Sequence, residues 1–210
     1  MSVNLAEAVE KLEKDSVMQE VQKRLDNGED VLRILEECRN GMTVVGDKFQ
    51  AGEAFLAELM LSGEIFKEVM KIIKPHMTQE ASQEKKGTVI MATLQGDIHD
   101  LGKDIVVTLL EARGFEVHNL GVDVPVGALV EKVKEVKPDF VGFSSLLTPN
   151  IQVMKQTVDL LVENNLRDKL KVMIGGGITT DKAREFVGAD FQTLDANEGV
   201  NYCVSVMEGN

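Results

Sequence analysis

From Thr88 onward, short apolar runs alternate with amphipathic stretches, and this alternation constrains the fold more than any other feature of the sequence. The apolar runs predict strands over residues 88–94, 116–120, 139–144, 171–175 and 190–194. The amphipathic stretches predict helices over residues 102–113, 126–136, 150–165, 180–187 and 197–208. The alternation predicts an α/β domain with a doubly wound, five-stranded parallel sheet. In the flavodoxin-like strand order, which we expect here, a crevice opens between the first and third strands.

The chain before this alternation follows a helical period and contains no convincing strand up to about residue 77. Its apolar residues recur at the spacing of one helix face, as in Leu5, Ala8, Val9 and Leu12. This pattern predicts a small all-α helical-bundle cap domain. The polar stretch 79–87 is typical of a linker. We therefore expect two domains, a cap with its linker over residues 1–86 and the α/β domain over residues 87–210.

Helix breakers divide the predicted cap into four or five short helices. The expected breaks lie at residues 26–28, at residues 40–41 and near Gly52. Asp30 is placed to cap a helix that begins at Val31. Pro75 is placed to end the last helix.

Composition excludes several classes of partner. The chain has 23 basic and 35 acidic residues, a formal net charge of -12, which disfavours nucleic acid and electrostatic membrane binding. No apolar run approaches the roughly 18–20 residues of a membrane span, and the first residues do not resemble a signal peptide. Cys38 and Cys203 lie far apart and form no zinc or disulfide pattern. We expect a reduced, cytoplasmic protein.

Three polar or glycine-rich loops follow the first, third and fourth predicted strands. The first, residues 96–102, contains Asp97 and His99, and an Asp two residues from a His can orient the imidazole as a metal ligand. The second spans residues 142–150. The third contains Gly175, Gly176 and Gly177, which allow a close approach of the backbone to a ligand. Because these loops follow the carboxyl ends of parallel strands, we expect them to meet at one edge of the sheet.

Each of these loops also has an ordinary explanation when it is considered alone. A single loop histidine is usually a surface or hydrogen-bonded residue, and three glycines usually form a turn. The Ser144–Ser145 pair could simply bond the backbone. A flavodoxin-like domain with an incidental histidine is therefore the plain alternative. The glycines match neither the dinucleotide fingerprint nor the phosphate loop, which disfavours hydride-transferring and phosphate-cleaving enzymes.

The combination of these motifs resembles a known family. Asp97-x-His99-x-x-Gly102, Ser144-x-Leu146 and Gly176-Gly177 together resemble the cobalamin-binding signature. The stretches 41–49 and 52–59 resemble the helical cap that accompanies it. The resemblance covers nearly the whole chain. It is to the free-standing corrinoid proteins of methyltransferase systems and to the cobalamin module of methionine synthase.

This resemblance implies a role for each motif residue toward a bound cobalamin. His99 would replace the corrinoid's own benzimidazole as the lower ligand of cobalt, with Asp97 bonded to its other ring nitrogen. Gly102 would let the nucleotide tail pass, Ser144 would bond the tail base, and the loop 175–177 would border the tail channel. Asn150 stands where methionine synthase ends its Asp–His relay in a serine.

The resemblance also implies a role for the cap. Phe55, Leu59 and Met60 are the candidates to shield the upper face of cobalt, although all three also fit an ordinary bundle core. The cap would then move aside during methyl transfer. His76 and His118 have no motif context, and we expect them to be structural or surface residues.

The implied function is that of a methyl carrier that is not catalytic alone. The bound corrinoid would accept a methyl group from a substrate-specific methyltransferase as methyl-Co(III). A second methyltransferase would pass it to tetrahydrofolate or to a thiol such as coenzyme M, and a reductive activase would be a further partner. The alternatives are a cobalamin-dependent sensor or regulator, which would need an output region, and the cobalamin subunit of a mutase, which lacks this cap.

Overall fold

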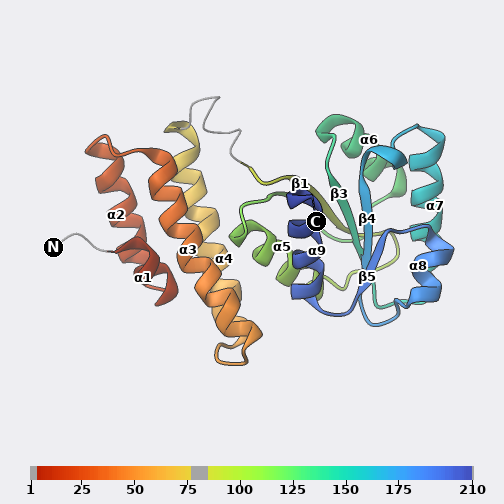
Figure 1. Ribbon diagram of the computed structural model, residues 1–210, viewed down its shortest axis with the longest axis horizontal. Coiled ribbons are helices and arrows are strands. Elements are labelled where there is room, and N and C mark those ends of the chain that lie inside the picture. Colours follow the sequence, from red (N-terminus) through yellow and green to blue (C-terminus); the bar gives the residue numbers. More distant parts are fainter. Residues whose placement is uncertain (1–3, 77–84, 210) are drawn as a thin grey trace. The chain divides into compact units, whose positions relative to one another are not determined.

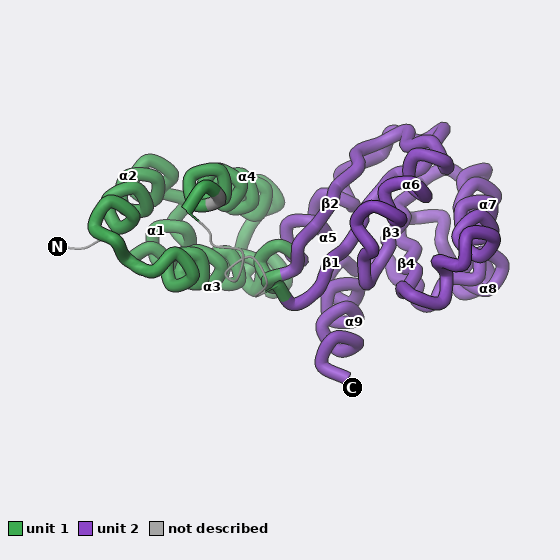
Figure 2. Tube along the Cα trace, turned by 90° about the horizontal axis from the view of Figure 1, so that it is seen from above, with its two compact units in different colours: residues 1–85, 111–114 green, residues 86–110, 115–210 purple. Residues whose placement is uncertain are grey.

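The computed structural model describes residues 4–76 and 85–209 and divides into two compact units (Figures 1 and 2). The helical unit comprises residues 1–85 and 111–114, and the α/β unit comprises residues 86–110 and 115–210. Most of the predicted linker, residues 79–87, lies outside the described residues.

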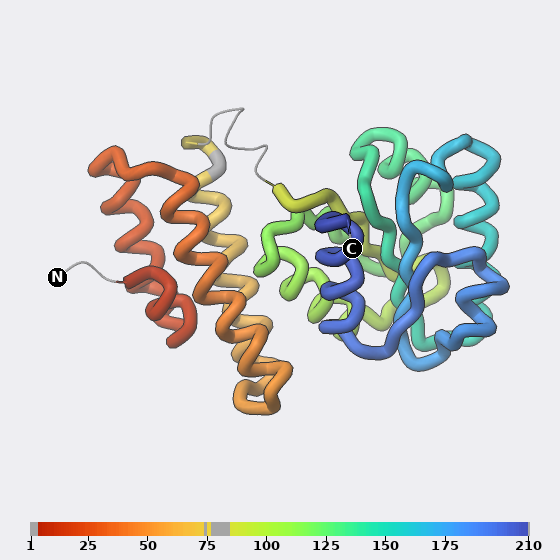
Figure 3. The backbone as a smooth tube through the Cα atoms, in the orientation of Figure 1, coloured from red at the N-terminus to blue at the C-terminus, as the bar shows by residue number. Residues whose placement is uncertain are grey.

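The helical unit is a bundle of the helices α1 (Leu5–Glu10), α2 (Lys14–Asp26), α3 (Val31–Gln50) and α4 (Leu56–Ile73), and it has no strand within residues 4–76. A 3-10 turn, Lys74–His76, follows α4, so the helix ends beside Pro75 as predicted. The long helices α3 and α4 lie side by side (Figure 3). The apolar side chains that share one face of each helix form the core, among them the fully buried Leu5, Val17, Ile34 and Ile65.

The start of α3 agrees with the sequence prediction, but its expected interruption is wrong. Asp30 caps the helix, because its side chain accepts a hydrogen bond from the Leu32 N–H at 3.1 Å. The helix then continues through Asn40–Gly41, where a break was expected. A Cβ atom at Gly41 would lie 2.5 Å from the Ala6 carbonyl oxygen. Gly41 therefore lets α3 approach α1 closely and does not end the helix.

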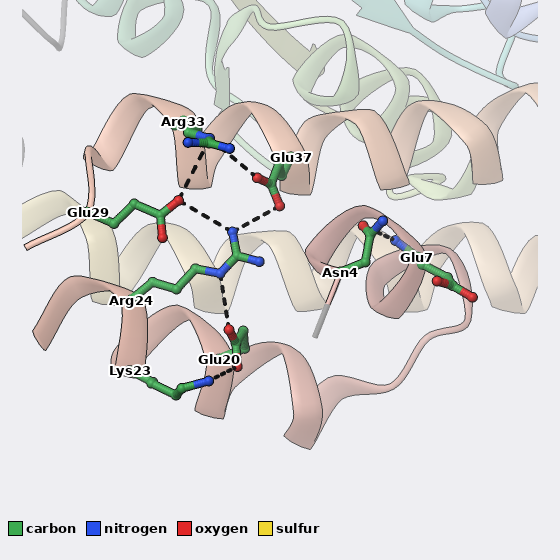
Figure 4. Close-up of polar contacts among 8 residues, drawn as sticks. All are labelled: Asn4, Glu7, Glu20, Lys23, Arg24, Glu29, Arg33 and Glu37. Atoms are coloured by element: carbon green, nitrogen blue, oxygen red, sulfur yellow. Dashed lines mark hydrogen bonds and ion pairs between the residues drawn. The ribbon is translucent and has the colours of Figure 1, made fainter. Parts of the chain in front are cut away.

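A network of charged side chains joins α2 to α3 (Figure 4). Arg24 is its centre, with Nε 3.2 Å from Glu20, and with Nη1 3.0 Å from Glu37 and 3.6 Å from Glu29. Arg33 lies 3.8 Å from both Glu29 and Glu37. Because Arg24 and Glu20 are largely shielded from water, this network holds the two helices together better than isolated surface pairs would.

The α/β unit has the predicted flavodoxin-like architecture. Its strands are β1 (Thr88–Thr93), β2 (Glu116–Asn119), β3 (Phe140–Ser144), β4 (Lys171–Gly175) and β5 (Phe191–Thr193). The helices are α5 (Leu101–Ala112), α6 (Val126–Val136), α7 (Asn150–Glu163), α8 (Asp181–Val187) and α9 (Ala196–Glu208), with a 3-10 turn at Arg167–Lys169. All strand pairs are parallel, in the order β2-β1-β3-β4-β5. The expected strand order and fold class are confirmed.

Helices cover both faces of this sheet (Figure 1). The side chains of Ile90, Val141 and Val172 pack with α6, α7 and α8. On the opposite face, Met173 contacts Cys203 of α9, with the two sulfur atoms 3.4 Å apart. This double burial explains why the central strands read as continuous apolar runs in the sequence. Within the described part of the chain, no helix is both long and apolar enough to span a membrane.

Candidate functional site

The carboxyl ends of β1, β3 and β4 bring the three predicted loops to one edge of the sheet. Thr93, the last residue of β1, lies opposite Ser144, the last residue of β3. Ser144 in turn lies opposite Gly175, the last residue of β4. The loop after each strand therefore begins at the same level. Because β1 and β3 are followed by helices on opposite faces of the sheet, this edge is the switch point at which such folds bind ligands.

Asp97 is the buried centre of this edge. Its side chain is fully buried and accepts hydrogen bonds on both carboxylate oxygens. Oδ1 lies 2.6 Å from Nδ1 of His99 and accepts from the His99 backbone N–H at 2.9 Å. Oδ2 accepts from Ser145 Oγ at 2.5 Å and from the Leu146 N–H at 2.9 Å. Residues 145 and 146 of the second loop thereby hold the carboxylate that orients His99.

These contacts fix the ionisation of Asp97. Burial alone would raise the pKa of its carboxyl group. The hydrogen bonds from Ser145, from the backbone N–H groups of His99 and Leu146 and from the His99 ring outweigh burial and hold that pKa well below its usual range. An ionised Asp97 accepts a hydrogen bond from Nδ1 of His99 and so places the ring proton on that nitrogen.

His99 is consequently prepared to coordinate a metal through its other ring nitrogen. The His99 side chain is 49% exposed. Its Nε2 atom has no hydrogen-bond partner among residues 4–76 and 85–209. A neutral imidazole with its proton on Nδ1 carries a lone pair on Nε2. Asp97 and His99 together thus offer one oriented nitrogen ligand at this edge of the sheet.

Ser145 is the contact that sequence reasoning missed. The motif pointed to Ser144 as a ligand-binding residue and to Asn150 as the end of the Asp–His relay. In the structure Ser145 donates to Asp97, whereas Asn150 is buried at the start of α7 and is not among the groups that bond Asp97 in the described chain. Ser144 is half-buried at the end of β3. The adjacent pair of serines was the only signal, and it does not tell which hydroxyl reaches Asp97.

The glycine loop after β4 supports Ser145. Gly176 has a φ of 103°, and a Cβ atom there would lie only 2.1 Å from the Ser145 carbonyl oxygen. The Ser145 N–H donates to the Gly175 carbonyl at 3.1 Å. A Cβ at Gly177 would meet only the end of the Leu146 side chain, at 3.3 Å. Gly176 is therefore required for two loops to touch, whatever ligand they hold.

The surroundings of His99 fit a large, flat cofactor with an apolar surface. Four large apolar side chains lie exposed in the first two loops, at Ile98, Leu101, Leu146 and Leu147. Exposed apolar groups that gather in this way mark ligand or partner surfaces. Beside them, a Cβ atom at Gly102 would meet nothing within 4 Å, so there is open space at the start of α5. A corrin ring with an extended nucleotide tail suits this combination of features.

The three cap residues that are candidates to cover cobalt differ in exposure. Leu59 of α4 is buried, and Phe55 is 81% exposed immediately before α4. Met60 is half-buried. Leu59 thus has the burial of a core residue, and Phe55 has a side chain that is free to cover a ligand. Their contact with cobalt stays a prediction.

The cysteines are poor candidates for reactive groups. Cys38 and Cys203 are both free thiols inside their units. Burial raises the pKa of each thiol to about 12, because an apolar surrounding disfavours the thiolate. Neither side chain is suited to act as a nucleophile or as a thiolate ligand near neutral pH.

Comparisons with known proteins give matches to both units of the chain. Residues 87–202 match the B12 binding domain model, and residues 3–74 match a second model that is also described as a B12 binding domain. The chain is 39% identical over 196 residues to the dimethylamine corrinoid protein of Methanosarcina barkeri, covering 93% of this chain and 92% of that one. It is 40% identical over 189 residues to the trimethylamine corrinoid protein of the same organism, covering 89% and 87%.

Solved structures give a similar result. The methanol:cobalamin methyltransferase complex of Methanosarcina barkeri matches with a TM-score of 0.87 and 28% identity, covering 99% of this chain and 79% of that one. A cobalamin-binding protein of Desulfitobacterium hafniense DCB-2 matches with a TM-score of 0.69 and 38% identity, covering 95% of both chains.

Proposed function

The chain belongs to the B12-binding corrinoid proteins, and from this premise we propose that it is the methyl carrier of a multi-component methyltransferase system. The prediction of a cobalamin cofactor is confirmed by this membership. The single observation that carries the proposal is the imidazole of His99, whose Nδ1 is held by the buried Asp97 while its Nε2 is open. Such a nitrogen could replace the corrinoid's own base as a ligand of cobalt.

Each site residue has a defined task in this proposal. His99 Nε2 would bind cobalt, and Asp97 would keep the proton on Nδ1. Ser145 holds Asp97 in place. Gly102 leaves room for the nucleotide tail, Ser144 bonds the tail base, and the loop 175–177 borders the tail. The bound corrinoid supplies the transfer chemistry, because its cobalt holds the methyl group between two enzymes.

A methylamine is the class of methyl donor that we favour. The dimethylamine and trimethylamine proteins are 39% and 40% identical to this chain, whereas the chain of the methanol complex is 28% identical. The donor itself would bind to a separate substrate methyltransferase. A second methyltransferase would take the methyl group to tetrahydrofolate or a thiol. A reductive activase would return oxidised cobalt to the reduced state that accepts a methyl group. Methanol is the alternative donor.

Reconstitution with partner enzymes tests this function. Loaded with cobalamin, the purified chain should show the spectrum of a corrinoid whose benzimidazole is displaced. Once an added reductant has brought its cobalt to Co(I), it should be methylated only when a substrate methyltransferase and its donor are added, with methylamine enzymes faster than the methanol enzyme. The measurement is the absorbance change of the bound corrinoid on methylation.

Two controls make the outcome decisive. The donor without its methyltransferase should give no methylation, because this chain offers no substrate site of its own in the proposal. Free cobalamin at the same concentration should be methylated more slowly than the loaded chain. Failure to bind any corrinoid would end the methyl-carrier proposal, and rapid demethylation of a donor by the chain alone would contradict the role of a carrier.

A further inference from the structure

The loop that carries His99 is held on two sides. Ser145 and Leu146 hold the Asp97 carboxylate from the side of β3, as described above. On the other side lies the connection between β2 and α6, residues 120–125. This connection continues the sheet pairing beyond the end of β1, because Leu94 and Val124 form a parallel bridge. The motifs singled out in the sequence include no residue of this second support.

Asp123 joins the β2–α6 connection to the loop that carries His99, residues 96–102, which we call the site loop. Its carboxylate Oδ1 accepts a hydrogen bond from the Gly96 N–H at 2.8 Å. Its own backbone N–H donates to the Asp97 carbonyl at 3.0 Å. Asp123 therefore bonds two consecutive residues of the site loop, one through its side chain and one through its backbone.

The backbone of Asp123 is in an uncommon conformation that allows both of these hydrogen bonds. Its φ is +52°, in the left-handed region that most side chains disfavour and that Asp, Asn and Gly tolerate best. Uncommon backbone conformations persist only where their surroundings hold them, and they gather at functional sites. The two hydrogen bonds to residues 96 and 97 are such a surrounding.

The turn that Asp123 holds, residues 94–97, leads directly to His99. The Asp97 N–H donates to the Leu94 carbonyl at 3.2 Å, which closes a turn in which Gly96 has a φ of +91°. From that turn, Asp97 Oδ1 accepts from both the backbone N–H and the ring Nδ1 of His99. A shift of the turn would move the Asp97 carboxylate and with it the ring of His99.

We propose that Asp123 is a positioning residue for His99: by fixing the turn 94–97, it sets the direction in which the imidazole presents Nε2. The inference rests on the proposed role of His99 as a cobalt ligand. What Asp123 contributes is a hydrogen-bond acceptor in a left-handed backbone, not a negative charge. Asparagine can supply both of these properties, and glycine can supply only the backbone.

The test compares Asp123→Asn and Asp123→Gly in the full chain. We expect Asp123→Asn to behave as the wild type. In Asp123→Gly, we expect the constant for imidazole coordination to Co(II) in the cobalamin-loaded chain to fall about tenfold, the size of effect seen when a partner of a metal ligand is lost. The readout is the nitrogen hyperfine splitting in the electron paramagnetic resonance spectrum. In the corrinoid-free chain, amide hydrogen exchange at Gly96 and Asp97 should become faster.

Asn165→Gly is the matched control for the glycine itself. Asn165 also has a positive φ, +55°, and lies in the turn after α7. This variant should leave coordination and exchange at the site loop unchanged. Wild-type coordination and exchange in Asp123→Gly would overturn the inference, and so would an equal loss in Asp123→Asn. If the wild type itself shows no imidazole coordination, the proposed function of His99 fails, and the exchange rates alone decide the role of Asp123.

Discussion

His99→Ala should lower the affinity for cobalamin by at least about tenfold and remove the nitrogen hyperfine splitting of bound Co(II), since a lost cobalt ligand costs at least as much as a lost partner of one. Some binding should remain, because the proposed burial of the tail beside Gly102 and the apolar side chains around the site do not depend on the imidazole. The measurement is a cobalamin titration followed by absorbance, with the spin-resonance spectrum of the Co(II) form.

His118→Ala is the control for this substitution. His118 lies on β2, with Nε2 3.4 Å from Glu116, and it takes no part in the site. Its replacement should leave affinity and splitting unchanged. Undiminished hyperfine splitting in His99→Ala would show that another nitrogen binds cobalt.

Asp97→Asn should destabilise the α/β unit as well as misdirect His99. The carboxylate accepts four hydrogen bonds on its two oxygens, whereas an amide accepts on one oxygen and turns its N–H groups toward the remaining donors. Leaving buried donors without an acceptor costs about 1–3 kcal/mol in the free energy of unfolding. The chain has no tryptophan, and Tyr202 is its single tyrosine. The Tyr202 ring stacks on the ring of Phe191, with the two ring centroids 4.3 Å apart. Tyrosine fluorescence during urea unfolding therefore reports this unit.

The loss of stability in Asp97→Asn should depend on pH. The pKa of Asp97 lies below its ordinary value of 3.8 in the folded chain, so its ionised form stabilises the fold above that pH. The contribution is lost as pH falls below the ordinary value toward the lower folded pKa. The difference between wild type and Asp97→Asn should be full at pH 7 and shrink below about pH 4. Asp100→Asn, an exposed aspartate of the same loop, should show neither effect. A difference that stays constant down to acid pH would contradict the assignment.

Much of the fold could be predicted from local pattern, because each buried strand and amphipathic helix has its own period. The expected strand 171–175 and helix 126–136 coincide with β4 and α6. The helix break expected at Gly41 is absent, and the reason lies outside the local sequence. Gly41 is needed for contact with Ala6 and Val9 of another helix, and a single sequence does not show which helix will pack against it.

The site could be predicted at its centre and not at its supports. Asp97 and His99 lie two residues apart, so their contact follows from local geometry. Ser145 and Asp123 reach Asp97 and its neighbour Gly96 from 48 and 27 residues away, through the order of the strands. The strand order was assumed, because the sequence alone does not fix it. The choice between Ser144 and Ser145 depends on how the chain turns after β3.

The most direct test of the account is the origin of the nitrogen that binds cobalt. The chain would be produced with histidine labelled by nitrogen-15, loaded with unlabelled cobalamin and reduced to Co(II). We expect each three-line nitrogen splitting in the spin-resonance spectrum to become a two-line splitting, because the ligand atom is Nε2 of His99. An unchanged three-line pattern would mean that the corrinoid's own base stays on cobalt, and it would contradict the coordination of cobalt by His99.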